Sequence, residues 1–451
     1  MNQRIDSTAA SALCVGLNAT ILGIGLSRFA YTPLIPALSE QGWFIPALAS
    51  YLGAANLIGY LIGAFTAHQL SEWLGAKRTI LIAMGLVAAS FLLCASPAAF
   101  GWFAFWRFVA GMAGAILMVV GPSLALQYTD ARNRPIIATM IFMGIGLGIL
   151  LSASLMPYLL SLGLSITWLA LGGLSLCAAA LGGLGLNRLP AHTVPHTTDT
   201  APSRSSLPSA VWLIVIAYGF DAAGFIPHTI FWVDYLTREL TIGRDAALMQ
   251  WAILGSGAML GPVIAGRLVK FGGWQRALIS AYLLKTLAIV IPVASHSLLW
   301  LSLSSFLVGA MIPGIVSLTS GYLAEIVGIQ RHKHVWGLAT AGFAVVQAVS
   351  GMAMSAFYDQ AGSYAPLFPL AAGFMAIGML AIGFSRHVST VPHDATKPDL
   401  ANQNPAIQNL EKQDLANPGN AQLQPTQPFT KRRSTKRQST RPTTPQTMED
   451  Q

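Results

Sequence analysis

A short stretch near the middle of the chain, residues 218–232, places titratable side chains inside an apolar run. Its polar and aromatic members follow 3,4,3,4 spacing, which predicts one shared helical face for Tyr218, Asp221, Phe225, His228 and Trp232. If the run that begins near residue 210 crosses a bilayer, Asp221 lies about 16 Å inside it, close to the midplane. A carboxylate at that depth costs about 2.5 to 3.5 kcal/mol on insertion scales, so we expect it to face a wet cavity or a cation. Such a residue can bind a proton or help to bind a ligand.

The composition predicts the environment of this stretch. Hydrophobic residues make up 54% of the 451 residues, charged residues only 10%, and there are 43 glycines, which is too apolar for a soluble chain of this length. We therefore predict an all-α polytopic membrane protein. Cys14, Cys94 and Cys177 all fall in apolar runs and show neither a disulfide framework nor zinc-ligand spacing. The sequence indicates no metal and no cofactor.

Twelve apolar runs approach or exceed the length of about 20 residues that a spanning helix needs, and they form two sets of six. The runs lie near 10–34, 46–70, 79–96, 100–127, 135–158 and 163–187, and then near 210–233, 247–266, 277–295, 298–323, 335–356 and 364–384. We predict an N-terminal six-helix bundle over residues 1–187, a polar cytoplasmic linker over 188–208 and a C-terminal six-helix bundle over 209–385. Residues 386–451 are rich in Asn, Gln, Pro, Thr and Ser with a basic cluster at 431–441, which predicts a disordered basic cytoplasmic tail.

Basic residues are concentrated in every second loop of the predicted topology. With the N-terminus inside, the loops before the tail that face the outside hold only Arg238 and Arg244. The cytoplasmic segments hold Arg4, Lys77, Arg78, Arg132, Arg134, Arg188, Arg204, Arg267, Lys270, Arg276, Arg331 and Lys333. By the positive-inside rule we predict a multi-pass protein of the inner (plasma) membrane with both termini in the cytoplasm. The formal charge of +9 then describes topology, and we expect no nucleic-acid partner.

The two sets of runs carry an internal repeat. The segment Arg107 to Gly111 returns 198 positions later as Ser305 to Gly309, and the loop near Gly75 returns at the same offset near residue 273. The same register in two separate places predicts two pseudo-symmetric six-helix bundles. Such repeats are typical of transporters, with the substrate site between the halves near the midplane.

These features resemble the major facilitator superfamily. Its loop motif Gly-x-Leu-Ala-Asp-Arg-x-Gly-Arg-Lys is matched in part after the second run, where Gly75, Lys77 and Arg78 fit while Glu72 stands at the Asp and His68 at the first Gly. The resemblance implies the major facilitator fold and a gating role for Glu72, Gly75, Lys77 and Arg78. Three further segments, 23–33, 227–232 and 340–347, resemble the YbfB/YjiJ-type branch over residues 10–385. The family also implies that the first, fourth, seventh and tenth helices line a central cavity.

The remaining charges within the runs are Arg28, Arg107 and Lys285. Arg28 and Arg107 lie at one depth on two helices implied to line the cavity, and two guanidiniums there would form a donor set for a carboxylate, sulfonate or phosphate. Each residue has a structural alternative: Arg28 could extend to the interface, Arg107 could be structural, and Lys285 could pair or extend. Asp221 could simply pair with a neighbouring helix, and His228 could be a packing residue.

From these residues we predict a secondary active transporter that moves a small organic anion by alternating access with proton symport. The predicted substrate-binding residues are Arg28, Tyr31, Arg107, Tyr218, Phe225, Trp232 and Gln347, and the predicted proton-coupling residues are Asp221 and His228. The alternative is proton-coupled efflux of amphipathic or drug-like compounds, which the aromatic stripe and Arg107 also fit. Gln347 could equally form an interhelical hydrogen bond. The sequence indicates no enzyme, and the expected partners are a small molecule, protons and the lipid bilayer around a monomer.

Overall fold

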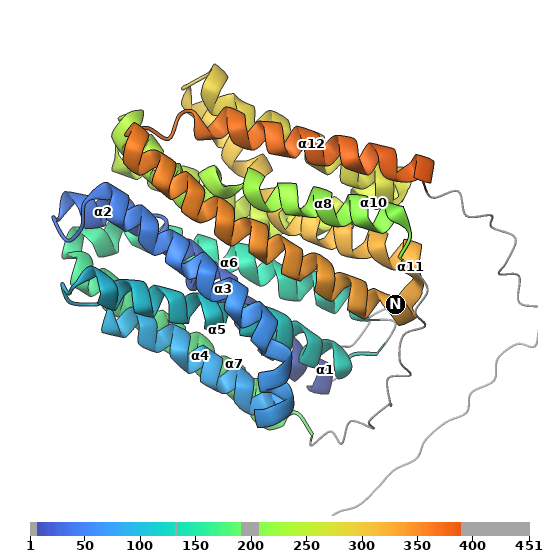
Figure 1. Cartoon of the computed structure of the whole chain (residues 1–451). Helices are drawn as coiled ribbons and strands as arrows, with labels where there is room; N and C mark the ends of the chain where they lie inside the picture. The colour runs from blue at the N-terminus through green and yellow to red at the C-terminus, as the bar shows by residue number, and fades with distance from the viewer. Residues whose placement is uncertain (1–6, 131–132, 191–206, 389–451) are drawn as a thin grey trace, which may run out of the picture. The chain divides into compact units, whose positions relative to one another are not determined.

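A computed structural model describes residues 7–130, 133–190 and 207–388, and in those ranges the chain is helical with no strand (Figure 1). The predicted linker therefore lies mostly outside the described residues, and the predicted tail lies outside them from residue 389 onward. The division into domains at the predicted boundaries stays a prediction. We call residues 7–188 the first half and residues 209–388 the second half.

The first half contains six spans. The first span is irregular: α1 (Ser7–Thr20) continues as a π-helical turn (Ile21–Leu26), a 3-10 turn (Phe29–Tyr31) and α2 (Leu34–Glu40). The others are regular: α3 (Pro46–Leu74), α4 (Ala76–Leu93), α5 (Phe100–Gln127), α6 (Arg134–Leu162) and α7 (Leu164–Arg188).

The second half repeats this plan. Its first span is again irregular: α8 (Ser209–Gly224), a π-helical turn (Pro227–Phe231), α9 (Trp232–Asp234) and a second π-helical turn (Tyr235–Glu239). The remaining helices are α10 (Arg244–Ala294), α11 (Leu298–Ala361) and α12 (Leu367–Val388). The backbone leaves the helical conformation at Gly273 in α10 and at Gly328 in α11, where φ is 73° at both.

The predicted count of twelve spans is confirmed. Eleven helical stretches of the described chain are long and apolar enough to cross a membrane, but one of them, Arg244–Ala294, has 51 residues. A helix of that length would extend about 76 Å, more than twice the thickness of a hydrocarbon core. Because the positive φ of Gly273 reverses the chain, this stretch is two spans.

The predicted repeat is visible in the backbone as well. Gly75 and Gly273, 198 positions apart, both have positive φ and both separate two spans. Gly59 lies against the carbonyl oxygen of Phe108, where a Cβ would come within 1.9 Å, and the equivalent Gly257 lies against that of Phe306 at 2.1 Å. Equivalent glycines thus bring equivalent helices into contact, as expected for two six-helix bundles.

The two halves meet along two pairs of helices. The helix α6 packs on α10, and α3 packs on α11. The contact is close, because a Cβ on Gly146 of α6 would lie 2.1 Å from the backbone nitrogen of Met259 in α10. We call the end where α1 and α8 begin the terminal end, and the end where α2 ends and α3 begins the opposite end (Figure 1).

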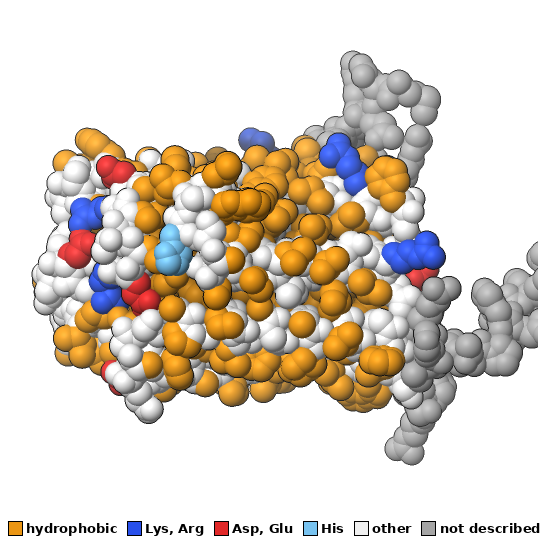
Figure 2. All heavy atoms as spheres, turned by 90° about the horizontal axis from the view of Figure 1, so that it is seen from above, with side chains coloured by type: hydrophobic (Ala, Val, Ile, Leu, Met, Phe, Trp, Pro, Cys, Tyr) orange, Lys and Arg blue, Asp and Glu red, His pale blue; other side chains and the backbone are white. Residues whose placement is uncertain are grey.

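Apolar side chains cover the outside of the described helices. Leu169, Leu287 and Phe384 are among many large hydrophobic residues that are exposed. Figure 2 shows hydrophobic side chains over the middle, with acidic and basic side chains gathered toward the two ends. Exposure on this scale would not be stable in water, so the chain is a multi-pass membrane protein.

Candidate functional site

Both irregular spans interrupt the helix at equivalent places. Arg28 lies between the π-helical and 3-10 turns of the first span. The repeat offset of 198 makes residue 226, next to Phe225, the equivalent position in the second half. In the second half the chain changes from α-helix to π-helix at Pro227, which has no N–H group to continue the ladder. Interrupted helices at corresponding positions of two repeats are typical of transporter binding sites.

Asp221 forms a buried ion pair. Its Oδ1 accepts a hydrogen bond from Nζ of Lys285 at 2.5 Å, and the two side chains are 2% and 0% exposed. The cation that the sequence requires beside Asp221 is therefore Lys285, on the second span of α10. Pairing with a neighbouring helix was the structural alternative for both residues, and the geometry fits it.

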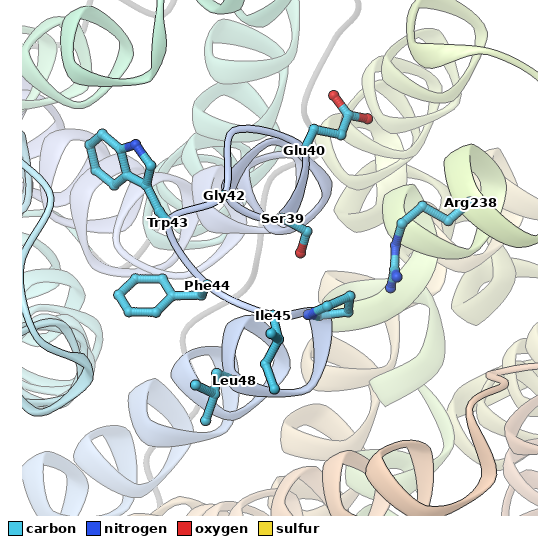
Figure 3. A pocket seen from close by; sticks show the side chains of 9 residues that line it. Ser39, Glu40, Gly42, Trp43, Phe44, Ile45, Leu48 and Arg238 are labelled. Carbon is cyan, nitrogen blue, oxygen red and sulfur yellow. The ribbon is translucent and has the colours of Figure 1, made fainter.

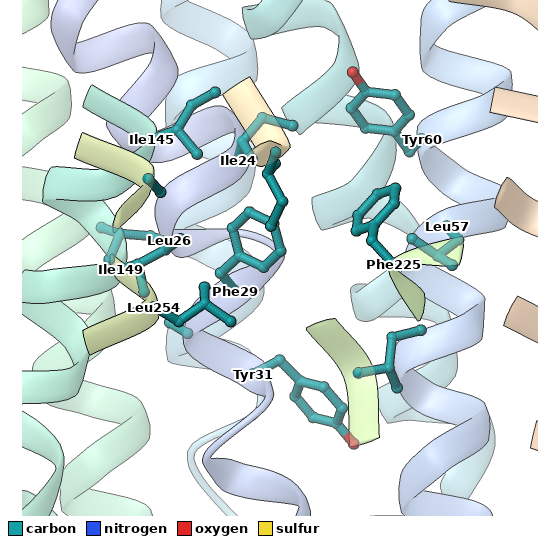
Figure 4. Close-up of a cluster of buried hydrophobic side chains, with 14 of the residues drawn as sticks. Ile24, Leu26, Phe29, Tyr31, Leu57, Tyr60, Ile145, Ile149, Phe225 and Leu254 are labelled. Atoms are coloured by element: carbon teal, nitrogen blue, oxygen red, sulfur yellow. The ribbon is translucent and has the colours of Figure 1, made fainter. Parts of the chain in front are cut away.

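Arg28 reaches from the first half into the second. Its Nη1 donates to Oε1 of Gln347 at 2.9 Å, and its guanidinium carbon lies 5.2 Å from the ring centres of both Phe29 and Phe225. Phe29 and Phe225 belong to one cluster of buried side chains contributed by both halves (Figure 4). Nε and Nη2 of Arg28 have no hydrogen-bond partner among the described residues, although the Arg28 side chain is only 8% exposed.

Phe225 connects Arg28 to the buried ion pair. Nζ of Lys285 lies 4.7 Å from the centre of the same ring, so cations from the two halves lie against one aromatic side chain. The site thus contains Arg28, Lys285 and Asp221, with Gln347 and Phe225 between them. With all three groups ionised its net charge is +1.

Arg107 has a different environment. Its guanidinium carbon lies 4.3 Å from the ring centre of Tyr31, whose hydroxyl donates to the carbonyl oxygen of Ala49. Nε and Nη1 of Arg107, like Nε and Nη2 of Arg28, have no hydrogen-bond partner among the described residues, and the pairing of the two guanidiniums in one donor set stays a prediction. Arg28 extends from an irregular segment to Gln347 of the second half, whereas Arg107 projects from the helix α5 and contacts Tyr31 within the first half.

The predicted single face is divided by the π-helical turns. Tyr218 and Phe225 both stack on Phe343 of α11, with ring centres 4.5 and 5.9 Å apart. His228 and Trp232 instead face the earlier part of α11. Nε2 of His228 lies 2.9 Å from Oγ of Ser304, and the indole N–H of Trp232 donates to Oγ of Ser305 at 3.0 Å. A π-helical turn holds more residues than an α-helical turn, so 3,4 spacing does not keep one face beyond Pro227.

The predicted gating loop lies at the terminal end. Gly75 has a φ of 82° and joins α3 to α4, and Nζ of Lys77 donates to the carbonyl oxygen of Leu189 at 2.7 Å. Glu72 is exposed and pairs with His68 of its own helix at 3.2 Å, and Arg78 is exposed. The described contacts of Glu72 and Lys77 are thus made with His68 of the first half and with Leu189, which directly follows it.

A polar network that the sequence did not predict joins the halves at the opposite end. Asp234 accepts hydrogen bonds from Arg238 and, at 2.7 Å, from the hydroxyl of Tyr364, which lies 3.0 Å from Oγ of Ser50 in the first half. Nearby, Arg244 pairs with Glu40 across the halves. The spacing of Asp234 and Arg238, four residues apart, was the one available signal for this network.

A surface pocket of about 560 Å³ lies at the same end, lined by residues of the segment 39–48 and by Arg238 (Figure 3). Since hydrogen bonds join the halves at this end, the structure is closed there. Among the described residues, no group of three or more His, Cys, Asp or Glu side chains could hold a metal ion.

Comparisons with known proteins agree with this architecture. The profile of a family described as "Uncharacterised MFS-type transporter YbfB" matches residues 20–382, where MFS denotes the major facilitator superfamily. The uncharacterized MFS-type transporter YceJ of Bacillus subtilis (strain 168) is 26% identical over 276 residues, which cover 58% of this chain and 67% of that protein. A gallate transporter of Pseudomonas putida is 32% identical over 129 residues, which cover 28% of this chain and 29% of that protein.

A solved structure shares the fold. The crystal structure of a D-xylose-proton symporter superposes with a TM-score of 0.66 at 17% sequence identity, covering 85% of this chain and 98% of that chain. At this identity the likeness concerns the fold alone.

Proposed function

The chain belongs to the YbfB-type family of major facilitator transporters, and from this premise we propose that it carries a small organic anion across the membrane by alternating access, coupled to protons. The observation that supports the proposal is the ion pair of Asp221 and Lys285 beside Arg28, whose Nε and Nη2 are without a partner among the described residues. Arg28 belongs to one half and the ion pair to the other. A ligand bound there would therefore respond to the movement of the halves.

Charge provides the coupling. With Asp221 ionised, Arg28, Lys285 and Asp221 carry a net charge of +1, which one monoanion neutralises. Protonation of Asp221 removes the counterion of Lys285 and raises the charge to +2. Because uncompensated charge in a buried site is costly, protonation favours anion binding and anion binding favours protonation by the same factor.

We assign the coupling proton to Asp221 and not to His228. The hydroxyl of Ser304 donates to the carbonyl oxygen of Ala288 at 2.7 Å, so it accepts from Nε2 of His228, and that ring also stacks on Trp232 at 4.4 Å. His228 is thereby held by its neighbours as a packing residue. Asp221, in contrast, contacts the cation whose charge the proton would release.

The relative from Pseudomonas putida supports an anionic substrate, because gallate is a carboxylate. The orientation follows from charge: Lys77, Arg78, Arg188 and Arg276 lie toward the terminal end, so we propose that this end and both chain termini face the cytoplasm of the inner (plasma) membrane. We propose that the transporter is a monomer.

Counterflow in proteoliposomes tests the proposal. Purified protein is first screened by thermal shift against benzoate, acetate, methanesulfonate, xylose and tetraphenylphosphonium, since a ligand of the folded state raises its apparent stability. Exchange of the best labelled probe is then measured with and without a pH gradient. We expect the gradient to drive accumulation by the native protein and not by Asp221→Asn, which should still exchange.

Arg28→Lys separates the anion site from proton coupling. The variant keeps the positive charge but loses the pair of N–H groups with which a guanidinium binds a carboxylate in a bidentate manner. We therefore expect at least roughly 10-fold weaker anion binding. Proton-driven accumulation by Asp221→Asn equal to that of the native protein would remove Asp221 from the mechanism. Stabilisation by tetraphenylphosphonium alone would favour efflux of amphipathic compounds instead.

A further inference from the structure

We propose that the anion is an aromatic carboxylate, with its carboxylate on Arg28 and its ring against an aromatic track formed by the side chains of His332, Trp336, Tyr218, Phe343 and Phe225. This inference rests on the proposed function and specifies the substrate class of the same site. Two independent features carry it: the free edge of one guanidinium and the arrangement of the rings that lead to it.

The free edge of Arg28 has the geometry that binds a carboxylate in this same protein. Arg238 donates from Nε to Oδ1 of Asp234 at 2.6 Å and from Nη2 to Oδ2 of the same carboxylate. In Arg28 the same two groups, Nε and Nη2, lack a partner among the described residues, while Nη1 is held by Gln347. A buried guanidinium with this edge unsatisfied is complementary to a planar anion with two oxygens.

The aromatic track runs from the terminal end to Arg28. Its rings stack in sequence: His332 on Trp336, Trp336 on Tyr218, Tyr218 on Phe343, and Phe343 on Phe225. Adjacent ring centres are 4.5 to 6.4 Å apart, and the planes are inclined by 14 to 33°. The track ends at Phe225, whose ring centre is 5.2 Å from the Arg28 guanidinium carbon.

The rings of the track differ in their exposure. His332 and Trp336 at the terminal end of the track are partly exposed and Phe225 beside Arg28 is buried, while between them Tyr218 is buried and Phe343 is partly exposed. At the opposite end, the hydrogen bond between Ser50 and Tyr364 closes the space between the halves. A flat apolar ring entering from the terminal end would pass these aromatic side chains before its carboxylate reached Arg28.

A ligand series on the purified full-length protein tests the inference. The probes are benzoate, cyclohexanecarboxylate, hexanoate and benzamide, measured by binding and by counterflow in proteoliposomes. We expect benzoate to bind roughly 2- to 10-fold more tightly than cyclohexanecarboxylate, which has the same carboxylate and a similar size but no aromatic face. Benzamide, which lacks the charge, should bind at least roughly 10-fold more weakly than benzoate.

Two matched variants locate the preference. Phe343→Leu removes a ring from the track and should bring the ratio of benzoate to cyclohexanecarboxylate affinity close to one. Phe374→Leu removes a partly buried ring of α12 that stacks on Phe220 outside the track, and it should leave the ratio unchanged. If Phe343→Leu does not fold, Phe343→Tyr, which should keep the preference, and the ligand series on the native protein still decide.

The outcomes separate this inference from the proposed function. Equal affinity for benzoate and cyclohexanecarboxylate, with binding still dependent on Arg28, overturns the aromatic specificity and leaves anion transport intact. Binding of neutral or cationic compounds without any carboxylate overturns both. A preference for benzoate that is lost in Phe343→Leu and kept in Phe374→Leu supports the assignment.

Discussion

Removing either partner of the ion pair of Asp221 and Lys285 should destabilise the protein. The loss of stability should depend on pH in opposite directions for the two variants. Both side chains are almost fully buried and 2.5 Å apart, and removing one partner of such a pair typically costs about 3 to 5 kcal/mol. The remaining group can limit this loss by becoming neutral. The cost of doing so depends on pH in a direction set by the group.

In Lys285→Met the remaining group is a carboxyl. With a reference pKa of about 3.9 for a free aspartate, holding a carboxyl protonated costs about 4 kcal/mol at pH 7 and about 1.5 kcal/mol at pH 5. The folded variant would then bind one more proton than the unfolded chain, so its stability should fall as pH rises through this range. Acidification should therefore rescue Lys285→Met.

In Asp221→Asn the remaining group is an amine. With a reference pKa of about 10.4 for a free lysine, holding it neutral costs about 4.5 kcal/mol at pH 7 and about 2 kcal/mol at pH 9. Here the unfolded chain binds the additional proton, so stability should rise with pH and alkaline conditions should rescue the variant. The double variant Asp221→Asn with Lys285→Met should show neither trend.

Unfolding in mild detergent, followed by tryptophan fluorescence between pH 5 and 9, measures these trends. A double-mutant cycle at pH 7 should give a coupling of several kcal/mol, because each single variant leaves a buried group that the double variant removes. If the two single-variant losses are additive and their pH profiles are parallel, the two groups do not form a charged pair, and the charge argument for proton coupling fails with it.

Two further predictions concern the contact between the halves. Gly146→Ala should lower stability by about 1 to 3 kcal/mol and slow counterflow, because its Cβ would lie 2.1 Å from the backbone of α10, whereas Gly173→Ala, with nothing within 4 Å of its Cβ, should leave both nearly unchanged. Glu40→Gln should change stability by less than about 1 kcal/mol, since its pair with Arg244 is partly exposed. Accessibility of the opposite end can be followed with Ser50→Cys in a background without native cysteines. This cysteine should react faster with an impermeant maleimide when Glu40→Gln is present. An unchanged labelling rate would contradict a role of the Glu40–Arg244 pair in closing the opposite end.

Much of the fold could be predicted because apolar length and repeat register are local properties of the sequence. The twelve spans and the equivalence of Gly75 with Gly273 follow from them, and the structure confirms both. Gly273 alone separates the two spans that make up the 51-residue stretch α10. The linker and the tail lie largely outside the described residues, and their predicted properties stay predictions.

The candidate site could be predicted only in part, because sequence spacing gives depth along a helix but not the direction of a side chain after an irregular turn. The π-helical turns at Ile21–Leu26 and Pro227–Phe231 change that direction. Arg28 therefore contacts Gln347 of the second half, and His228 contacts Ser304 instead of continuing the face of Asp221.

The pairing of Asp221 with Lys285 could have been predicted from the sequence. Both residues lie about 18 Å from the terminal end at 1.5 Å per residue, counted from Ser209 and from Gly273. The family resemblance implies a cavity lined by the first, fourth, seventh and tenth helices, and Lys285 lies on none of these. Equal depth and opposite charge are the stronger physical criteria, since an unpaired charge at that depth is costly on any helix. Together with Arg28, the pair forms a site of two cations and one acid, so one proton on Asp221 raises the charge of the site from +1 to +2.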